Sequence, residues 1–211
     1  MIKAKAGPGT RSIVRSAGVA LVAASIGTVA AMSHHPTGAH SGALGPAVHG
    51  AMILFLGLMA FGFVGMILWR GASRPLMVAG VLAYAISLFG HLVAGTINGF
   101  VVPAIAARGV GAISHDIFVL AWETNQAFAK LGVLATSAAY VLWSIDLLTD
   151  GDRRPKIIGL LGLVAGVAPA ALLLGGSIQM NVAGAFLSYV IQAAWAALVG
   201  VAMIRAAQSS L

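Results

Sequence analysis

The chain has no cysteine and very little charge. The absence of cysteine from all 211 residues excludes disulfides, thiolate metal sites and cysteine nucleophiles. Only 8% of the residues are charged, whereas a soluble domain carries roughly a quarter, and 60% are apolar. This composition is typical of a protein that crosses a membrane several times.

Acidic residues are especially scarce. Five Asp and Glu face twelve Lys and Arg, which leaves a net charge of +7. A basic balance can indicate a nucleic-acid partner, but most of these basic residues stand in short polar stretches beside apolar runs. There they set the orientation of the spans. We therefore expect the lipid bilayer as partner and no nucleic acid.

Six apolar runs predict an all-α bundle of six transmembrane helices. The expected spans are about 16–32, 47–69, 75–107, 115–148, 157–174 and 182–206. They form one domain, 16–206, between a basic N-terminus, 1–15, and a short tail, 207–211. Segment 115–148 is longer than the roughly 20 residues of an upright span. It is either one tilted helix or an interfacial helix followed by a span.

The distribution of basic residues predicts that both termini are cytoplasmic. Ten of the twelve fall on one side of a six-helix arrangement, and only Arg108 and Lys130 do not. Trp69 and Trp143 then mark the inner interface and Trp122 the outer one. The acidic residues that follow the fourth span, Asp146, Asp150 and Asp152, are expected to be solvated. The location that fits best is a bacterial inner membrane, as a multi-pass protein.

All six histidines fall on the outer side of this topology, and two of them lie inside spans. His49 and His91 stand on neighbouring antiparallel helices, at depths that agree to roughly 6 Å at 1.5 Å per residue. Imidazole is a common ligand of metals and of haem iron. The pair, with Asn98 nearby, therefore predicts a shared haem b or a copper, iron or zinc ion. The alternative is that each histidine only hydrogen-bonds across helices.

The remaining histidines are weaker candidates for metal ligands. His34, His35 and His40 stand in the loop 33–46, which has no Lys or Arg, and His115 begins the fourth span. A loop with three histidines can gather a metal ion, but a solvated loop has the same composition. We therefore rank these four below His49 and His91.

The fourth span carries polar residues at a seven-residue spacing. Glu123, Lys130, Ser137 and Ser144 keep one helix face, with Gln126 on the same side. The stripe is expected to face the bundle or a water-filled cavity. Glu123 is a candidate metal ligand, a partner that orients a histidine, or a proton carrier; the alternative is a wet interfacial carboxylate. Lys130 is expected to reach outward to the interface.

Methionines recur on the second span at the same spacing. Met52, Met59 and Met66 carry thioethers, which are ligands suited to copper(I). Successive methionines are about 10.5 Å apart along the helix, which is too far for one site. The stripe is therefore interpreted as adaptable core packing.

Three functions fit these patterns. The first is a histidine-centred haem or metal site for electron transfer or membrane redox chemistry. The second is a small-solute or ion transporter that uses the Glu123 stripe and the proline-broken spans. The third is a non-catalytic subunit of a larger membrane complex, or a homo-oligomer. The sequence contains no P-loop, GxSxG or HExxH motif, so catalytic residues and enzymatic activity stay open.

Overall fold

The structure is a computed structural model, and it describes residues 8–36, 43–108 and 115–209. Within these residues all regular structure is helical, and six helices are long and apolar enough to cross a membrane. This confirms the expected all-helical architecture, and the six apolar helices fit a multi-pass membrane protein, whose insertion in a membrane stays a prediction. The side of the membrane on which the termini lie stays a prediction.

The helices follow one another with short connections. In chain order they are α1 (Pro8–Ser33), α2 (Leu44–Arg70), α3 (Pro75–Thr96), η1 (Ile97–Val101), α4 (Val102–Ala106), α5 (His115–Leu148), α6 (Arg153–Leu174) and α7 (Val182–Gln208). α1 begins at Pro8, so Arg11 and Arg15 lie within the helix and not before it. The long segment from residue 115 is one continuous helix of 34 residues, about 51 Å at 1.5 Å per residue. It is therefore one helix rather than two.

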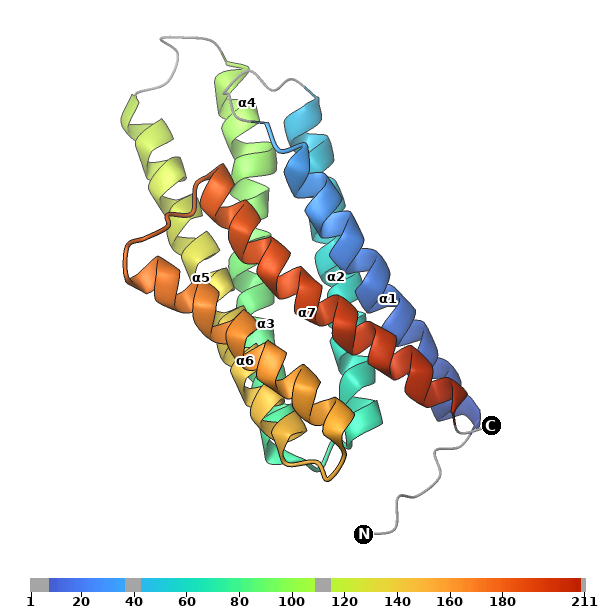
Figure 1. Ribbon diagram of the computed structural model, residues 1–211. Helices are drawn as coiled ribbons and strands as arrows, with labels where there is room; N and C mark the ends of the chain where they lie inside the picture. The colour runs from blue at the N-terminus through green and yellow to red at the C-terminus, as the bar shows by residue number, and fades with distance from the viewer. Residues whose placement is uncertain (1–7, 37–42, 109–114, 210–211) are drawn as a thin grey trace.

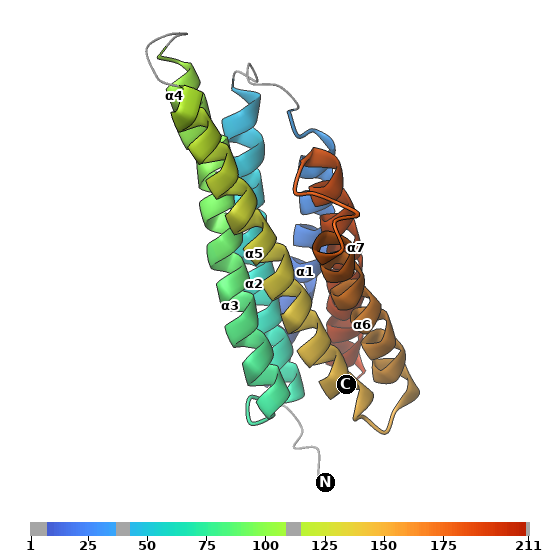
Figure 2. The same cartoon turned by 90° about the vertical axis from the view of Figure 1, so that its left-hand side faces the viewer.

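Helices distant in sequence lie side by side. α1 packs between α2 and α7, and α5 packs between α3 and α6 (Figures 1 and 2). The start of α1, the end of α7 and the α2–α3 and α5–α6 turns lie at one end of the bundle, which we call the inner end. The end of α1 and the start of α2 lie at the opposite end, which we call the outer end.

The core of the inner half is an aromatic cluster, comprising Phe63, Tyr84, Tyr140, Trp143 and Trp195. Trp143 is fully buried, its ring stacks 6.5 Å from that of Trp195, and its indole N–H donates to the carbonyl of Met77. The expectation that Trp143 sits in an interfacial belt is therefore wrong. A buried indole needs an acceptor, and the α3 backbone provides one.

Charged side chains close the inner end. Asp146 is 3% exposed and accepts hydrogen bonds from both Arg70 and Arg74, and Arg70 also forms an ion pair with Asp150. The sequence predicts that Asp146 is solvated, and this prediction is wrong. A buried carboxylate is stable only when it is paired, and here two guanidinium groups pair with it. The cluster ties the α2–α3 turn to the end of α5.

Glycines allow the closest helix contacts. A Cβ placed on Gly90 of α3 would lie 2.7 Å from the backbone nitrogen of Gly132 on α5. A Cβ on Gly159 or Gly166 of α6 would lie 2.8 Å from a carbonyl oxygen of α5. Only glycine permits backbones to approach this closely, as is common between membrane helices.

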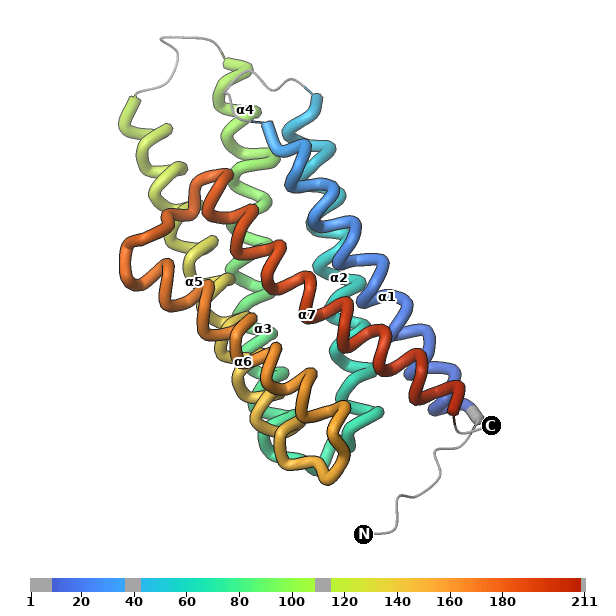
Figure 3. Tube along the Cα trace, viewed as in Figure 1, coloured from blue at the N-terminus to red at the C-terminus, as the bar shows by residue number. Residues whose placement is uncertain are grey.

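The third span changes its winding before it ends. α3 passes into a π-helical turn, η1, and then into α4, so the Cα trace runs on without a break (Figure 3). We expected Pro103 to kink this end, and the irregularity begins six residues earlier, at Ile97. Pro103 has no backbone N–H, so the α-helical hydrogen bond to the carbonyl of Gly99, four residues earlier, cannot form. Without this bond the preceding turn can widen into a π-helical turn.

Candidate functional site

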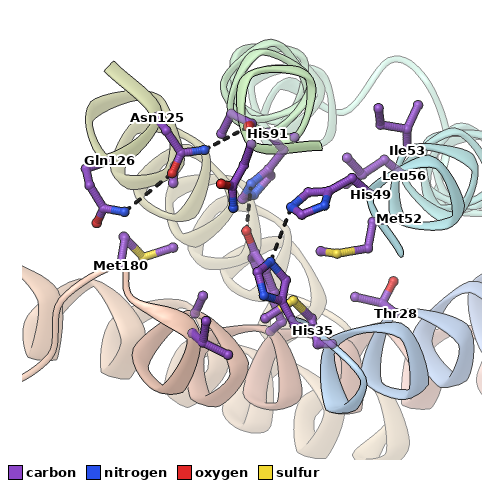
Figure 4. Close-up of a pocket in the computed structure, with 18 of the residues that line it drawn as sticks. Thr28, His35, His49, Met52, Ile53, Leu56, His91, Asn125, Gln126 and Met180 are labelled. Carbon is purple, nitrogen blue, oxygen red and sulfur yellow. Dashed lines mark hydrogen bonds between the residues drawn. The ribbon is translucent and has the colours of Figure 1, made fainter. Parts of the chain in front are cut away.

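A cavity of about 350 Å³ lies between the helices, and its lining residues run from the outer end toward the middle of the bundle. Figure 4 shows side chains that line it. α1, α2, α3, η1, α5 and α7 all contribute to its wall. Most of the lining is aliphatic or aromatic, with four methionines: Met32, Met52, Met59 and Met180. The polar side chains that line it include His35, His49, His91, Asn98, Asn125, Gln126, Tyr189 and Gln192.

His49 is held in the first turns of α2. Its Nδ1 lies 2.8 Å from the carbonyl oxygen of Gly45, one helical turn earlier, and only 5% of the residue is exposed. The ring packs against Gly99 of η1, where an added Cβ would lie 2.8 Å from the His49 Cγ. Helix α2 and the π-helical turn together therefore fix the orientation of this imidazole.

His35 lies beyond the end of α1 and turns back into the cavity. Its Nδ1 is 2.9 Å from the carbonyl oxygen of Pro36, and its Nε2 is 3.2 Å from the Nε2 of His49. The rings meet edge to face, with centroids 4.9 Å apart. Burial, and then the neighbouring imidazole of His49, lower the pKa of His35, although the Pro36 carbonyl opposes the shift.

Each Nδ1 faces a backbone carbonyl oxygen. A carbonyl oxygen only accepts hydrogen bonds, so these contacts favour a proton on the Nδ1 of His35 and on the Nδ1 of His49. In the neutral form, each Nε2 then presents a lone pair. The two Nε2 atoms lie 3.2 Å apart, which is the distance of an N–H···N hydrogen bond. This bond forms when one ring also carries a proton on its Nε2 or is in the other tautomer, so the two imidazoles are a hydrogen-bonded pair.

His91 lines the same cavity but has other partners. Its Nδ1 is 3.2 Å from the Tyr189 hydroxyl, and its ring packs on Gly132, where an added Cβ would lie 2.6 Å from the ring. The structure thus brings His49 and His91 to one cavity, as their depths predicted. The imidazole within hydrogen-bonding distance of His49, however, is that of His35.

Amide side chains border the cavity on the α3–α5 side. Asn98 of η1 and Gln126 of α5 are both half-buried and line it. Asn125 is 7% exposed and donates to the carbonyl of Ala94 at 2.7 Å, so it links α5 to α3. We did not select Asn125 from the sequence. Asn125 precedes Ala129, Gly132 and Thr136 at the spacing of one helix face, and all four are buried. This spacing is the pattern by which the sequence could have identified Asn125.

The polar stripe of α5 divides in two. Ser137 and Ser144 are buried, whereas Glu123 and Lys130 are exposed and do not line the cavity. The expectation that the stripe faces the bundle is therefore wrong for Glu123, whereas the exposed position of Lys130 agrees with the expectation that it reaches outward. Seven residues fall about 20° short of two full turns, so a seven-residue stripe rotates away from the bundle over three repeats. The assignment of Glu123 as a ligand stays a prediction that this geometry does not support.

The other histidines lie apart from the pair. His34 is exposed, with its Nδ1 2.9 Å from the carbonyl of Ala30, and His115 is exposed at the start of α5. His40 lies outside the described residues. Among the residues that the structure describes, no three His, Asp or Glu side chains gather as a metal-binding group.

The chain matches no family model, no curated protein and no solved structure. What the cavity does is therefore inferred from its own side chains.

Proposed function

We propose that this protein binds a transition-metal ion near the outer end of its bundle, with His35 and His49 as the ligands, and that it serves membrane redox chemistry or metal handling. The observation that carries the proposal is the 3.2 Å separation of the two Nε2 atoms while both Nδ1 atoms are bound to carbonyls. Metal-binding histidines commonly donate the second ring N–H to a backbone carbonyl, which orients the ring.

The geometry favours an ion over a haem. A haem between His49 and His91 needs the Nε2 of His49 to face the iron, but this atom faces His35. The buried environment also suits metal binding, because a partly dry site excludes water that competes for the ion. We place the site on the outer side of a bacterial inner membrane with both termini cytoplasmic, in keeping with the positions of the basic residues.

The test is metal analysis of the full-length protein purified in detergent. We expect about one ion per chain in the wild type, and loss of the ion in both His35→Ala and His49→Ala. His34→Ala is the matched control, because His34 is adjacent in sequence, exposed and bonded only within its own helix end. Undiminished occupancy in the two cavity variants would overturn the proposal.

A visible spectrum of the same samples separates ion from haem. A haem shared by His49 and His91 gives a Soret band that disappears in His49→Ala and His91→Ala and persists in His35→Ala. An ion at the pair gives no Soret band, and its occupancy depends on His35.

A transporter is the second candidate, and one feature favours it. The cavity is bordered by a π-helical turn that carries Asn98 and is followed by Pro103, both of which line it. π-Helical turns occur often at functional sites. Uptake of a metal ion or small solute into proteoliposomes that falls in Asn98→Ala would support transport. Metal binding without any flux would favour a redox or storage role.

A further inference from the structure

We infer that the deeper part of the cavity binds the ring of a quinone, a neutral, lipid-soluble compound with two carbonyl oxygens. This site lies inward of His35 and His49 and does not depend on the proposed metal site. It follows from the size and the wall of the cavity, and from hydrogen-bond donors of α3 and α7 that the other described residues leave unused.

The cavity has the size and the wall of a site for a small organic molecule. An apolar cavity of about 150 Å³ is enough to bind benzene, and this one is about 350 Å³, so it has room for a substituted or fused ring. Its lining is mainly apolar with a few polar groups, as in sites that orient a small molecule. None of the described lining residues is Asp, Glu, Lys or Arg, so a charged organic compound would find no counter-charge there. The occupant is therefore neutral.

His91 and Tyr189 together supply one hydrogen-bond donor to the cavity. The Nδ1 of His91 lies 3.2 Å from the Tyr189 hydroxyl, no described residue hydrogen-bonds the Nε2, and both residues line the cavity (Figure 4). If the hydroxyl donates to Nδ1, the neutral imidazole carries its proton on Nε2. If Nδ1 donates instead, the hydroxyl keeps a free proton. In either tautomer the neutral pair retains one hydrogen for a ligand oxygen.

The hydroxyl of Tyr84 is a second donor. Tyr84 lines the same cavity and is 6% exposed, and its hydroxyl is buried without a hydrogen-bond partner among the described residues. Such groups are rare in folded proteins because a buried polar group without a partner is costly. A ligand oxygen would supply the partner. Tyr140, which also lines the cavity, differs in this respect, because its hydroxyl already donates to the carbonyl of Gln192 at 3.2 Å.

The spacing of these donors fits a ring with an acceptor at each end. Tyr84 and His91 are both on the buried face of α3, seven residues apart, which is about 10.5 Å along the axis at 1.5 Å per residue. The carbonyl oxygens of a para-quinone are roughly 5 Å apart, since C=O bonds of about 1.23 Å extend from opposite corners of the ring. A hydrogen bond of about 2.8 Å at each oxygen brings the span to about 11 Å. One quinone ring therefore reaches both donors.

A lipid acyl chain is the competing occupant. It fits an apolar wall equally well and forms no hydrogen bond. It would leave the Tyr84 hydroxyl unpaired and would also cut off the free hydrogen of the His91–Tyr189 pair from water. A quinone fills the same space and pairs both groups, so the polar part of the wall favours it.

The experiment titrates the full-length protein in lipid nanodiscs with menadione, a fused-ring quinone, by isothermal titration calorimetry. 2-Methylnaphthalene is the matched ligand, because it has the same carbon skeleton without the carbonyl oxygens. Empty nanodiscs provide the blank for partition into lipid. We expect one menadione per chain in the wild type. Tyr84→Phe, and separately His91→Leu combined with Tyr189→Phe, should each weaken menadione binding about tenfold, the effect of one hydrogen bond. Neither change should alter the binding of 2-methylnaphthalene.

The stability of the ligand-free protein distinguishes a ligand contact from a structural one. Tyr84→Phe removes an unpaired hydroxyl, so the Tm should not fall. Tyr140→Phe is the matched control: it removes a hydrogen bond within the protein, so the Tm should fall while menadione affinity stays that of the wild type. Circular dichroism and size-exclusion profiles establish that each variant folds.

Three outcomes overturn the inference. The first is a wild-type protein that does not bind menadione. The second is an equal loss of menadione and 2-methylnaphthalene in the variants, which would show that the apolar wall alone holds the ring. The third is unchanged menadione affinity when the donors are removed, which would identify an apolar occupant such as an acyl chain. Metal analysis of the same samples tests the proposed metal site separately, so failure of one proposal leaves the other in place.

Discussion

The contact between Gly99 and His49 provides the sharpest test of how the site is built. Gly99 stands in the π-helical turn, and a Cβ there would lie 2.8 Å from the Cγ and 3.4 Å from the Nδ1 of His49. Ordinary contacts between carbon atoms are about 3.5–4.0 Å. The nearest atom to that Cβ is the Cβ of His49, which no rotation of the ring can move. Gly99→Ala therefore forces η1 and α2 apart.

The size of the effect follows from that overlap. Overpacking by one methyl group costs about 1–3 kcal/mol, which corresponds to roughly a 5- to 150-fold change in an equilibrium constant. Moving the helices lowers the free energy of unfolding by that amount. If the displacement also separates the His49 Nδ1 from the Gly45 carbonyl, affinity at the proposed metal site falls as well. Metal titration measures the change in affinity, and thermal unfolding of the same sample measures the change in stability.

Gly95→Ala is the matched control. Gly95 lines the same cavity one turn earlier, and a Cβ there would lie 3.7 Å from Ile53, an ordinary contact. We expect its metal affinity to equal that of the wild type. If Gly99→Ala also retained both wild-type affinity and wild-type stability, the contact would not position His49, and the account of the site given above would be refuted.

Three further predictions concern pH, the inner end and the topology. Because burial lowers the pKa of His35 below its ordinary 6.5, the unfolded chain binds a proton that the folded chain does not. The melting temperature of the metal-free protein should fall as the pH drops below 6.5, and His35→Asn should flatten this dependence. Asp146→Asn leaves Arg70, whose side chain is 8% exposed, with one carboxylate partner, Asp150, where it had two, and removes the carboxylate that pairs with Arg74. Unfolding should become easier by about 3 kcal/mol in a denaturant titration, with metal occupancy unchanged at the far end of the bundle. Because the chain has no cysteine, single cysteines at the exposed positions Ser73 and Ser177 report the topology. An impermeant thiol reagent added to whole cells should label Ser177→Cys and spare Ser73→Cys; the reverse pattern would show that the predicted orientation is inverted.

The helices could be predicted from the sequence because apolar runs of sufficient length have few alternatives in a membrane. Pro75 begins α3 as expected, since its missing N–H has no partner to lose in a first turn. His49 and His91 line one cavity because antiparallel neighbours joined by a tight turn keep a common depth. These predictions depend only on the length of the apolar runs, the helical rise per residue and the shortness of the turn that joins two helices.

Other parts of the site depend on packing that the sequence does not reveal. His35 follows a helix end, and its return to His49 is set by where α1 stops relative to α2. Asp146 resembles a surface charge until two arginines from the α2–α3 turn are brought to it. The Glu123 stripe was misjudged because a small angular error accumulates along a 34-residue helix.

Because of the π-helical turn, the effect of deleting one residue from the third span depends on where the deletion falls. The π-helical turn Ile97–Val101 holds one residue more than an α-helical turn. The side chains of α4 therefore point in the directions they would have in a continuous α-helix that lacked this extra residue. Deleting a residue inside this turn should leave α4 in place, whereas deleting one elsewhere in α3 rotates everything beyond it by about 100°. The first deletion would regularise the turn that supports His49. Such a chain would keep its six-helix outline and lose the proposed metal site, so insertions and deletions at this turn provide a route by which the proposed function can be lost without a new fold.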